Sequence, residues 1–542
     1  MQTDCVGESS NSCKEIRQVV RDIRTIMRGD KMRLQFQWDY EADVVVVGFG
    51  YAGALSAIAA HDAGADVLVL EKAPEDFAGG NSRVSGGGMR VPINIHDAIK
   101  YYKAVCFGTV PDEDIAAMAD AMTKVPGILR WLGIEIAELG LPRMRHPVAG
   151  GESFRLYSIA KNGKPVFEPI AAVGSGDLLY GALKQRVIDR RIKVWYETPA
   201  KKLVQNPLTK EILGVVAERK DKTIGVKARK AVVLACGGYE NNYEMWINFN
   251  FPGIKVYPWG SPYNTGDGIK MALDVGAALW HMVSIEWDCP CIKIPSEIYG
   301  CAVQTRVVGA MRPKVGSYIV VNKHGKRFMN ECKSLVHRKE PLELTHFDQE
   351  RLEYPNIPFY LIFDEAFRLQ GPLVKNTRIG WHNIFNLYEW SCDNSAEIDK
   401  GWIVKADTPR ELAKKLNINP EELEKTIISY NKNCEAKMDP DFHRPAETMI
   451  PLNSPPFYGV ELALTITNTQ GGPKRNAKAQ VLDTENKPIP RLYAAGELGS
   501  FWGFVYPGGS NIAEAIALGY IAGKNAATER PWNKASMHSM KG

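Results

Sequence analysis

"DVVVVGFGYAGALSAIAAHDAGADVLVLE", residues 43–71, is the stretch that decides the fold. Four consecutive valines predict a buried strand, the glycines after them predict a tight turn, and the alanine-rich run predicts a helix. Residues 66–71 then read as a second apolar strand that ends at Glu71. Uninterrupted apolar strands joined by a helix are typical of a parallel sheet that is covered on both faces. The stretch therefore predicts a strand–helix–strand unit of an α/β fold.

The glycines of this turn have the spacing of a phosphate-binding loop. Gly48, Gly50 and Gly53 form G-x-G-x-x-G directly after the strand, which permits a tight turn, close approach of a pyrophosphate and close packing of the helix on the strand. The start of the helix presents free N–H groups and a partial positive charge to the phosphate. Glu71 is placed to accept hydrogen bonds from a ribose diol. We therefore predict a dinucleotide-binding site.

Three later glycine-rich segments indicate which dinucleotide is bound. The second strand runs into a loop with glycines at residues 79–80 and 86–88, and two further apolar stretches, residues 231–238 and 491–497, also end in glycine or Gly-Glu. A nicotinamide dehydrogenase would instead continue with more strand–helix units. A glycine loop lets backbone approach a flat ring, so these segments are predicted to form one site from distant parts of the sequence.

Several motifs in a fixed order support a family resemblance over residues 40–530. They are "DVVVVGFGYAG", "LEKAPEDFAGGNSRVSGGGM", "LACGGYENN", "SPYNTGDGIKMALDVGA", "YIVVNKHGKRFMNE" and "LYAAGELGSFWGFVYPGGSNIAEAIALGYIAG". The chain resembles the flavoprotein family that includes soluble fumarate reductases, urocanate reductase and 3-ketosteroid dehydrogenases. The resemblance implies FAD as cofactor and an α/β fold: a Rossmann-like FAD-binding domain of the glutathione-reductase type with an inserted α+β capping domain.

The positions of the motifs predict the domain limits. The expected parts are an N-terminal extension (1–31), a first part of the FAD-binding domain (32–275), a capping or substrate domain (276–450), a second part of the FAD-binding domain (451–532) and a C-terminal tail (533–542). In the capping region, Leu412, Leu416, Leu423 and Ile427 have near-helical spacing, which predicts core packing.

The resemblance also implies a set of FAD contacts. They are Gly48, Gly50, Ala52, Gly53, Glu71, Lys72, Asn81, Ser82, Gly86, Gly87, Gly88, Met89, Ala200, Gly237, Gly238, Asn242, Asp267, Gly496, Glu497, Ser510, Asn511 and Ile512. For Glu497 a solvated turn carboxylate is the alternative. Relatives in membrane complexes carry a His-Thr pair for covalent attachment, whereas this loop reads Asn-Ser-Arg-Val at residues 81–84. We therefore expect noncovalent FAD.

A Tyr-Pro-Gly-Gly turn at residues 506–509 precedes the last predicted helix. Asn511 is a candidate N-cap and Glu514 stands three positions on, as in a capping box. In the family, this helix points its start at the side of the flavin ring that gains negative charge on reduction. A helix dipole and free N–H groups would stabilise that charge.

Two departures from the fumarate reductases concern the substrate. Asn468 stands where a histidine is expected and Tyr506 where an arginine is expected, so two cationic carboxylate clamps are absent. The ketosteroid dehydrogenases instead have a Tyr-Pro-Gly turn whose hydroxyl and backbone N–H bind the substrate ketone. Tyr506 is therefore the predicted carbonyl-polarising donor, with a backbone N–H of residues 508–510 as its partner; Ser510 replaces the family's glycine and leaves that partner open.

The group that moves a proton at the other carbon is less clearly marked. Leu335 stands where fumarate reductases have their catalytic arginine, while His337 and Arg338 follow it and Tyr318 lies on the preceding strand. These three are candidates, and a solvated basic loop is the alternative for His337 and Arg338. Trp502 and Phe504, just before the turn, predict either an apolar wall for a ring-shaped substrate or plain core packing.

The sequence thus predicts an FAD-dependent oxidoreductase of the EC 1.3 type. It would add or remove hydrogen across a carbon–carbon bond conjugated to a carbonyl, with a cyclic enone such as a 3-ketosteroid as substrate. Two alternatives stay open: reduction of an unsaturated carboxylic acid, and an electron-transferring flavoprotein subunit. The direction, the electron donor or acceptor and the oligomeric state are not indicated.

Composition narrows the partners and the location. The chain has 542 residues, 45% of them hydrophobic, and no apolar run near the ~20 residues that cross a bilayer. A net charge of +5 without a basic motif disfavours nucleic acid, and ten cysteines without Cys-x-x-Cys pairs predict neither a metal site nor a disulfide framework. We expect a cytoplasmic protein whose residues 14–28 form a short basic amphipathic helix.

Overall fold

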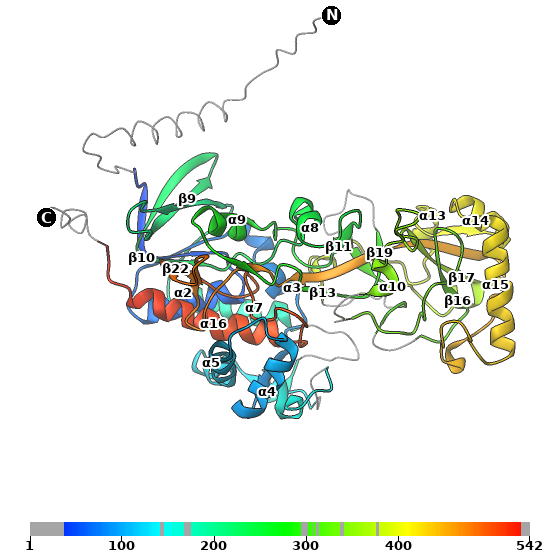
Figure 1. Ribbon diagram of the computed structural model, residues 1–542, viewed down its shortest axis with the longest axis horizontal. Helices are drawn as coiled ribbons and strands as arrows, with labels where there is room; N and C mark the ends of the chain where they lie inside the picture. The colour runs from blue at the N-terminus through cyan, green and yellow to red at the C-terminus, as the bar shows by residue number, and fades with distance from the viewer. Residues whose placement is uncertain are drawn as a thin grey trace, which may run out of the picture.

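In the computed structural model, the described residues are 37–140, 146–166, 175–293, 302–305, 307–310, 314–336, 341–374 and 379–532. They form an elongated molecule with one sheet toward each end (Figure 1). The amphipathic helix expected at residues 14–28 lies outside this part of the chain.

The first sheet contains the predicted strand–helix–strand unit. Its main path runs β21 (Gln480–Leu482), β22 (Pro488–Ala494), β10 (Lys222–Leu234), β1 (Tyr40–Val47), β2 (Val67–Leu70) and β7 (Lys193–Trp195). All neighbours from β22 to β7 are parallel, and β21 pairs antiparallel at the edge. β8 (Ala200–Gln205) and β9 (Ile212–Arg219) continue from the extended part of β10 as an antiparallel meander. The predicted α/β fold is confirmed.

Both faces of this sheet are covered, which explains the unbroken valine run. Val44 and Val46 of β1 pack in the core of α2 (Tyr51–Asp62) and α16 (Ser510–Thr528), while Val45 and Val47 pack against the meander and α9 (Asp267–Asp274). All four valines are buried because neither face of the strand meets water.

The second sheet is organised by one long strand, β19 (Phe457–Thr469), which runs from the middle of the molecule to its far end (Figure 1). The strands of this sheet are β11 (Val256–Pro258), β13 (Ile285–Trp287), β14 (Cys291–Lys293), β15 (Ala302–Gln304), β16 (Tyr318–Asn322), β17 (Phe359–Asp364) and β18 (Val404–Ala406) beside β19. β19 thus reaches both the far end and the first sheet's neighbourhood, and the domain limits drawn from the sequence remain a prediction.

Helices α14 (Pro409–Lys415) and α15 (Pro420–Glu435) pack on the far end of the second sheet (Figure 1). Each begins after a side-chain cap, Thr408 and Asn419 respectively. The four apolar residues singled out from the sequence here are all buried, so their predicted core role is confirmed; they are Leu412, Leu416, Leu423 and Ile427.

Smaller elements complete the described chain. β3 (Met89–Pro92), β4 (Ile136–Glu138), β5 (Phe154–Lys161) and β6 (Lys164–Pro165) form a small antiparallel sheet, and β12 (Leu279–Trp280) pairs with β20 (Gly472–Pro473). The other helices are α3 (Gly80–Val84), α4 (Ile95–Cys106), α5 (Asp112–Thr123), α6 (Val125–Trp131), α7 (Gly176–Asp189), α8 (Tyr243–Phe249), α10 (Leu342–Thr345), α11 (Glu365–Arg368), α12 (Trp381–Ile384) and α13 (Ser395–Asp399). None of the helices in the described ranges has the length and apolarity to span a bilayer.

Helices α2 and α16 approach each other through two glycines. A Cβ at Gly523 would stand 2.1 Å from the Ser56 carbonyl oxygen, and a Cβ at Gly519 would stand 2.7 Å from that of Ala52. The Ser56 hydroxyl donates to the Gly519 carbonyl at 2.9 Å. The last helix is therefore fixed against the first one by backbone contact.

Replacement of Gly523 by alanine is expected to destabilise the protein by at least ~1–3 kcal/mol, because the added carbon meets backbone that cannot rotate away. Gly181→Ala in α7 is the matched control, since no atom lies within 4 Å of its Cβ position; that change should be neutral or stabilising by ~0.5–1 kcal/mol. Denaturant unfolding measures both. Equal midpoints for Gly523→Ala and the parent would contradict the close approach.

Candidate functional site

A cavity of about 1010 Å³ opens where the parallel strands of the first sheet end. Val47, Leu70, Ala235 and Ala495, the last or next residues of β1, β2, β10 and β22, all line it. In open α/β sheets, ligands bind outside the carboxyl ends of the strands. The volume is at the upper end of the ~300–1,000 Å³ typical of small-molecule sites, so the cavity can hold a large ligand.

The glycines of the first turn bring backbone to the cavity as predicted. Gly48 has a φ of +99°, and a Cβ there would stand 2.3 Å from the Ala235 carbonyl oxygen. Gly50 lines the cavity, and the N–H of Tyr51 donates to the Ser82 hydroxyl at 3.0 Å. Gly53 does not line it; its Cβ position lies 2.0 Å from the Gly48 carbonyl oxygen, so this glycine packs the helix on the strand.

The predicted ribose acceptor is buried at the end of β2. Glu71 accepts hydrogen bonds from the N–H groups of Phe49 at 2.7 Å and Ala73 at 2.8 Å. Burial raises the pKa of this carboxyl above its ordinary value, while the two N–H groups favour the charged form. Each oxygen has two lone pairs, so Glu71 can accept a further hydrogen bond from a diol in the cavity.

Lys72 and Asp267 lie together on the neighbouring wall. The Lys72 ammonium donates to Asp267 and to the Thr265 hydroxyl, each at 2.7 Å. Both charged residues line the cavity, as their expected role requires. Because the two charges compensate each other, this wall is polar without a strong net charge.

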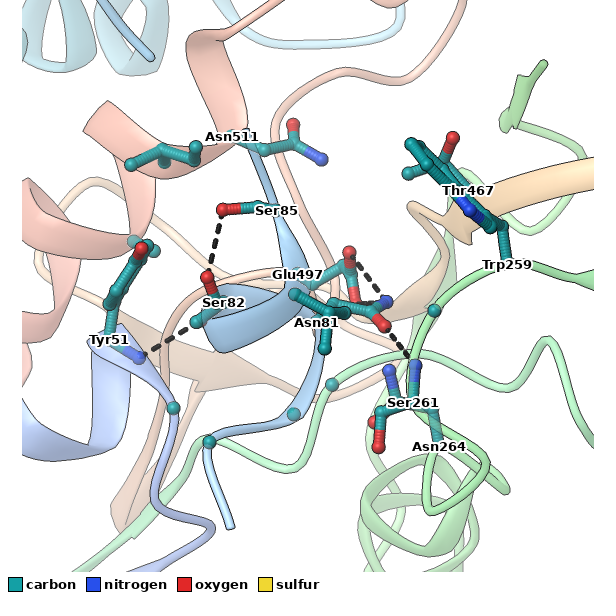
Figure 2. Close-up of a pocket in the computed structure, with 18 of the residues that line it drawn as sticks. Tyr51, Asn81, Ser82, Ser85, Trp259, Ser261, Asn264, Thr467, Glu497 and Asn511 are labelled. Carbon is teal, nitrogen blue, oxygen red and sulfur yellow. Dashed lines mark hydrogen bonds between the residues drawn. The ribbon is translucent and has the colours of Figure 1, made fainter. Parts of the chain in front are cut away.

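A group of amides and carboxyls forms the opposite side of the cavity (Figure 2). The Asn81 side chain donates to Glu497 at 3.1 Å and accepts from the Ser261 N–H at 2.8 Å. Glu497 lines the cavity and is not a solvated turn carboxylate, so the alternative left open from the sequence is wrong.

The last helix begins differently from the prediction. Gly509, with a φ of +74°, precedes α16, and no side chain caps the helix. Asn511 is inside the first turn and its amide donates to Gln470 at 3.1 Å. Gly509 can take the left-handed conformation without strain, so the chain enters the helix two residues earlier than an Asn511 cap requires.

Glu514 does not complete a capping box. Its buried carboxylate pairs with Arg475 and accepts from the Ser500 hydroxyl at 2.6 Å and the Phe501 N–H at 3.1 Å. A local sequence pattern could not predict this ion pair, because Arg475 lies 39 residues before Glu514. The predicted capping box therefore does not form, and it supplies no side-chain acceptor to the first-turn N–H groups of α16.

Most residues expected to hold the cofactor meet at this cavity. Those that line it are Gly48, Gly50, Ala52, Glu71, Lys72, Asn81, Ser82, Gly86, Gly87, Gly88, Ala200, Gly237, Asp267, Gly496, Glu497, Asn511 and Ile512. Gly53, Met89, Gly238, Asn242 and Ser510 do not. The cavity therefore collects residues that the sequence separates by more than 400 positions.

The exceptions have structural roles. Asn242 caps α8 by accepting from the Met245 N–H at 3.0 Å, and its amide donates to the Thr265 carbonyl. Met89 is fully buried on β3. A Cβ at Gly238 would meet the Thr469 hydroxyl at 2.3 Å, so this glycine makes room for neighbouring side chains.

The arrangement fits a dinucleotide that carries a flat ring. Two helices, α2 and α16, begin at the cavity without side-chain caps or acidic residues in their first turns, which suits a negative charge at each. The Asn511 side-chain oxygen is buried at the cavity with no hydrogen-bond partner in the described chain. An acceptor in this position calls for a donor on the ligand.

Beyond the glycine walls, the cavity extends between the two sheets. Its apolar lining here includes Leu156, Trp259, Val307, Val336 and Leu373. Arg90, Asp288 and Lys314 are the charged residues of this part. The sequence did not mark Arg90 or Lys314 as cavity residues, although Arg90 directly follows the glycines at residues 86–88 and Met89. The glycine pattern does not predict which way the arginine side chain points.

Tyr506 lines the cavity where the two parts meet. Its hydroxyl oxygen accepts the Gly509 N–H at 2.8 Å, and its carbonyl contacts a ring nitrogen of His146 at 2.9 Å. The Gly509 N–H is therefore engaged with Tyr506 itself, so it is not the second donor expected from residues 508–510; for Gly508 and Ser510 that expectation stays a prediction. Asn468 is turned away from the cavity lining and donates to Glu497.

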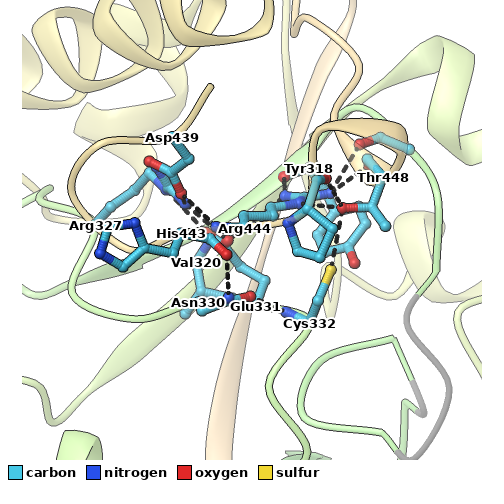
Figure 3. Close-up of polar contacts among 12 residues, drawn as sticks. Tyr318, Val320, Arg327, Asn330, Glu331, Cys332, Asp439, His443, Arg444 and Thr448 are labelled. Atoms are coloured by element: carbon cyan, nitrogen blue, oxygen red, sulfur yellow. Dashed lines mark hydrogen bonds and ion pairs between the residues drawn. The ribbon is translucent and has the colours of Figure 1, made fainter. Parts of the chain in front are cut away.

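Tyr318 is not a catalytic candidate. It is buried on β16, its hydroxyl donates to the Lys314 carbonyl at 2.9 Å, and it does not line the cavity. Figure 3 shows it beside Arg444, whose guanidinium lies 4.3 Å from the centre of the Tyr318 ring and donates to its carbonyl at 2.6 Å. Burial raises the pKa of this hydroxyl, which keeps it neutral.

A buried ion cluster holds the segment that follows β16 (Figure 3). Arg327 pairs with Glu331 and Asp439, each at 2.9 Å, and Arg444 lies 3.6 Å from Glu331. The cluster fixes the chain just before Leu335 and Val336. Leu335 is buried, with its N–H bound to the Gly309 carbonyl at 2.7 Å.

The remaining candidates divide as follows. His337 and Arg338 lie outside the described residues. Trp502 is buried against Tyr102, with ring centres 4.9 Å apart, and Phe504 stacks on Phe107 at 4.8 Å. Neither lines the cavity. Core packing is the role of Trp502, whereas Phe504 is half-buried and stacks on Phe107 at the surface.

Comparison with known proteins agrees with this geometry. Residues 43–512 match the sequence profile of the family described as FAD binding domain. The probable fumarate reductase Ifc3 of Shewanella frigidimarina is 29% identical over 89% of this chain and 74% of its own. The 3-oxosteroid 1-dehydrogenase of Mycobacterium tuberculosis H37Rv is 27% identical over 90% and 99%, and the urocanate reductase of Eggerthella lenta is 29% identical over 90% and 75%.

Solved structures share the fold. The 3-ketosteroid delta1-dehydrogenase of Sterolibacterium denitrificans, in complex with 1,4-androstadiene-3,17-dione, superposes with a TM-score of 0.73 at 24% identity, over 90% of this chain and 99% of that chain. An open conformation of a flavocytochrome c3 fumarate reductase has a TM-score of 0.68 at 24% identity, over 97% and 82%. The predicted architecture, an FAD-binding fold, is confirmed.

Gly50→Val is expected to abolish FAD binding while the protein stays folded. The added side chain would enter the cavity beside Ser82, whose hydroxyl lies 2.9 Å from the Cβ position, and fill the place a pyrophosphate needs. Gly127→Val on α6 is the control, because its Cβ position is open. Visible absorbance after desalting measures bound flavin. A folded Gly50→Val protein with its full FAD content would contradict the assignment.

Proposed function

This chain belongs to the FAD binding domain family, and from that membership and its site we propose an oxidoreductase that adds or removes hydrogen across a carbon–carbon bond next to a carbonyl. We propose a cyclic enone such as a 3-ketosteroid as the substrate. Bound FAD supplies the hydride chemistry. The chain's own residues must orient the substrate, exclude water and polarise the carbonyl.

The observation that carries the proposal is the position of Tyr506. Its hydroxyl is bound to the Gly509 N–H, and a Cβ at Gly509 would lie 3.3 Å from the Gly88 carbonyl oxygen of the glycine walls and 3.7 Å from the apolar Leu156. The hydroxyl oxygen accepts the Gly509 N–H, and a tyrosine hydroxyl is at the same time a hydrogen-bond donor. A donor that itself accepts a hydrogen bond is strengthened by polarisation. Tyr506 is thus suited to stabilise negative charge on a carbonyl oxygen.

The apolar part of the cavity supports a ring-shaped substrate. Its apolar surface comes from Leu156 on β5, from Trp259 just after β11, and from Val307 and Leu373 in connecting segments. Such walls bury a hydrocarbon ring favourably and strengthen hydrogen bonds by keeping water out. An electron-transferring subunit without small-molecule chemistry would have no use for this compartment, so we place that alternative last.

We further propose that FAD is held without a covalent bond. In the loop at residues 81–84, Ser82 accepts the Tyr51 N–H and Arg83 pairs with Asp177 at 2.7 Å, so these side chains serve the protein's own structure. Cys236 lines the cavity, but burial raises the pKa of its thiol to about 12, which keeps it protonated and unreactive.

The cytoplasm is the proposed site of action. Cys106, Cys236, Cys332, Cys392 and Cys434 are free thiols. Reduced thiols are the usual state in a cytosolic protein.

No group of His, Cys, Asp and Glu in the described residues is arranged to hold a metal ion, so the proposal needs only FAD and an electron partner.

One observation favours a second substrate class. Arg90 and Lys314 both line the substrate part of the cavity, and such cations bind carboxylates. An unsaturated carboxylic acid, as acted on by the relatives named fumarate reductase and urocanate reductase, is therefore the second candidate. The absence of an arginine at Tyr506 and of a histidine at Asn468 makes it the weaker one.

A substrate panel separates the candidates. Dye-reduced, FAD-loaded protein is mixed anaerobically with a 3-ketosteroid enone, with fumarate, with an aryl acrylate or with buffer, and reoxidation of the flavin is followed. We expect reoxidation by the enone and little by fumarate. Fumarate turnover at ~1–10³ per second, the usual enzyme range, would contradict the enone proposal. The saturated ketone with oxidised protein tests the opposite direction.

Tyr506→Phe is expected to slow flavin reoxidation by the enone ~10²–10³-fold, because one donor to the developing oxyanion is lost. FAD content should stay unchanged, because the hydroxyl contacts the Gly509 turn and not the glycine walls. Tyr243→Phe, at an exposed position on α8, is the control. A stable, FAD-replete Tyr506→Phe protein that reacts at nearly the parent rate would refute the catalytic role.

A further inference from the structure

Two glutamates that follow different strands both accept hydrogen bonds from the Asn81 side-chain amide beside the cavity. Glu240 follows β10 and Glu497 follows β22. The Asn81 side-chain nitrogen donates to Glu240 at 2.7 Å and to Glu497 at 3.1 Å, so a single nitrogen binds both carboxyl groups (Figure 2 shows Asn81 and Glu497). The two carboxyls are therefore within direct electrostatic reach of each other.

The other partners of the pair are neutral. Asn264 donates to Glu240 at 2.7 Å, and the Thr469 hydroxyl donates to it at 3.2 Å. Asn468 donates to Glu497. Within the described chain, neither glutamate takes part in an ion pair, whereas two other buried carboxylates, Glu331 and Glu514, are paired with arginines.

Ionising both of two buried carboxyl groups costs free energy when no cation lies beside them. Removal from water raises the pKa of both groups, and the charge of Glu240 raises the pKa of Glu497 further, well above its ordinary value. The amide donors oppose this shift but do not cancel it. A pair of this kind holds one proton between its members at neutral pH.

The geometry shows which member can use the proton. Glu240 is enclosed by three donors, Asn81, Asn264 and Thr469, and does not line the cavity. Glu497 lines the cavity. We propose that Glu240 and Glu497 share one proton, that Glu497 holds it, and that Glu497 therefore donates a hydrogen bond to the bound cofactor instead of accepting one.

This inference rests on FAD binding alone and not on the identity of the substrate. It assigns Glu240 a positioning role, because its negative charge keeps the neighbouring carboxyl protonated. Other ionisable groups also line the cavity: Glu71, Lys72, Arg90, Cys236, Asp267, Asp288 and Lys314. After burial, the charge of Glu240 is the largest cause that raises the pKa of Glu497.

The pH dependence follows with a definite sign. Glu497 donates only while protonated, so the hydrogen bond is complete below the raised pKa and is lost as the pH rises through it. FAD retention by the parent protein should therefore weaken toward alkaline pH. Replacing Glu240 by glutamine removes the repelling charge and lowers the pKa of Glu497, so the weakening should begin at lower pH.

The test compares the FAD-loaded parent protein with Glu497→Gln, Glu497→Ala, Glu240→Gln and Glu244→Gln. Glutamine at 497 keeps a donor and has no proton to lose, so its FAD release rate should stay near the parent value at neutral pH and should not change with pH. Alanine at 497 removes the donor and should release FAD ~10–100-fold faster. Glu244→Gln, an exposed position on α8, should behave as the parent does.

Infrared spectroscopy of the same proteins supplies a readout that does not depend on binding. The parent should show the carbonyl stretch of a protonated carboxyl group at neutral pH, and Glu497→Gln should lack it. Absence of that band in the parent, or release from Glu497→Gln as fast as from Glu497→Ala, would overturn the proposal. Melting temperatures identify a variant that fails to fold, and the band and the pH profile of the parent then decide alone.

Discussion

Backbone contact between two strand ends is the constraint on which the rest of the structure depends. The turn after β1 touches the residue after β10, since a Cβ at Gly48 would stand 2.3 Å from the Ala235 carbonyl oxygen, and α2 then packs on that turn at Gly53. No side chain fits between these backbones. The floor of the cavity is therefore made of peptide groups that a ligand can approach closely, and side chains with polar atoms are left to its rim.

The charges and dipoles of the fold are arranged around that floor. Helices α4, α8, α14 and α15 are all capped by a side chain, whereas α2 and α16, which begin at the cavity, have none. Helices α5, α6 and α7 also begin without a side-chain cap, so a missing cap alone does not mark the site. What suits α2 and α16 to an anionic ligand is that both begin at the cavity and have no acidic residue in the first turn. The contact between α2 and α16 fixes both helix starts relative to each other.

Local patterns predicted what depends on neighbours in the sequence. The strand–helix–strand unit, the glycine turn and most of the residues expected to hold the cofactor could be read from spacing and family motifs, and these residues do line the cavity. The start of α16 could not be predicted in this way. The N-cap is Gly509 and not Asn511, and Glu514 pairs with Arg475, which belongs to a distant segment of the sequence. The sequence also did not predict which way two side chains point. Tyr318 is buried in the core of the second sheet, and Arg90 lines the cavity.

A crystal structure of the FAD-loaded protein with an unreactive saturated cyclic ketone tests the central claim most directly. The account predicts the ring between the apolar walls of the cavity, with its carbonyl oxygen ~2.6–3.2 Å from the Tyr506 hydroxyl. The Gly509 N–H should still donate to that hydroxyl. A carbonyl bound by Arg90 or Lys314, with Tyr506 out of reach of the ligand, would contradict the account.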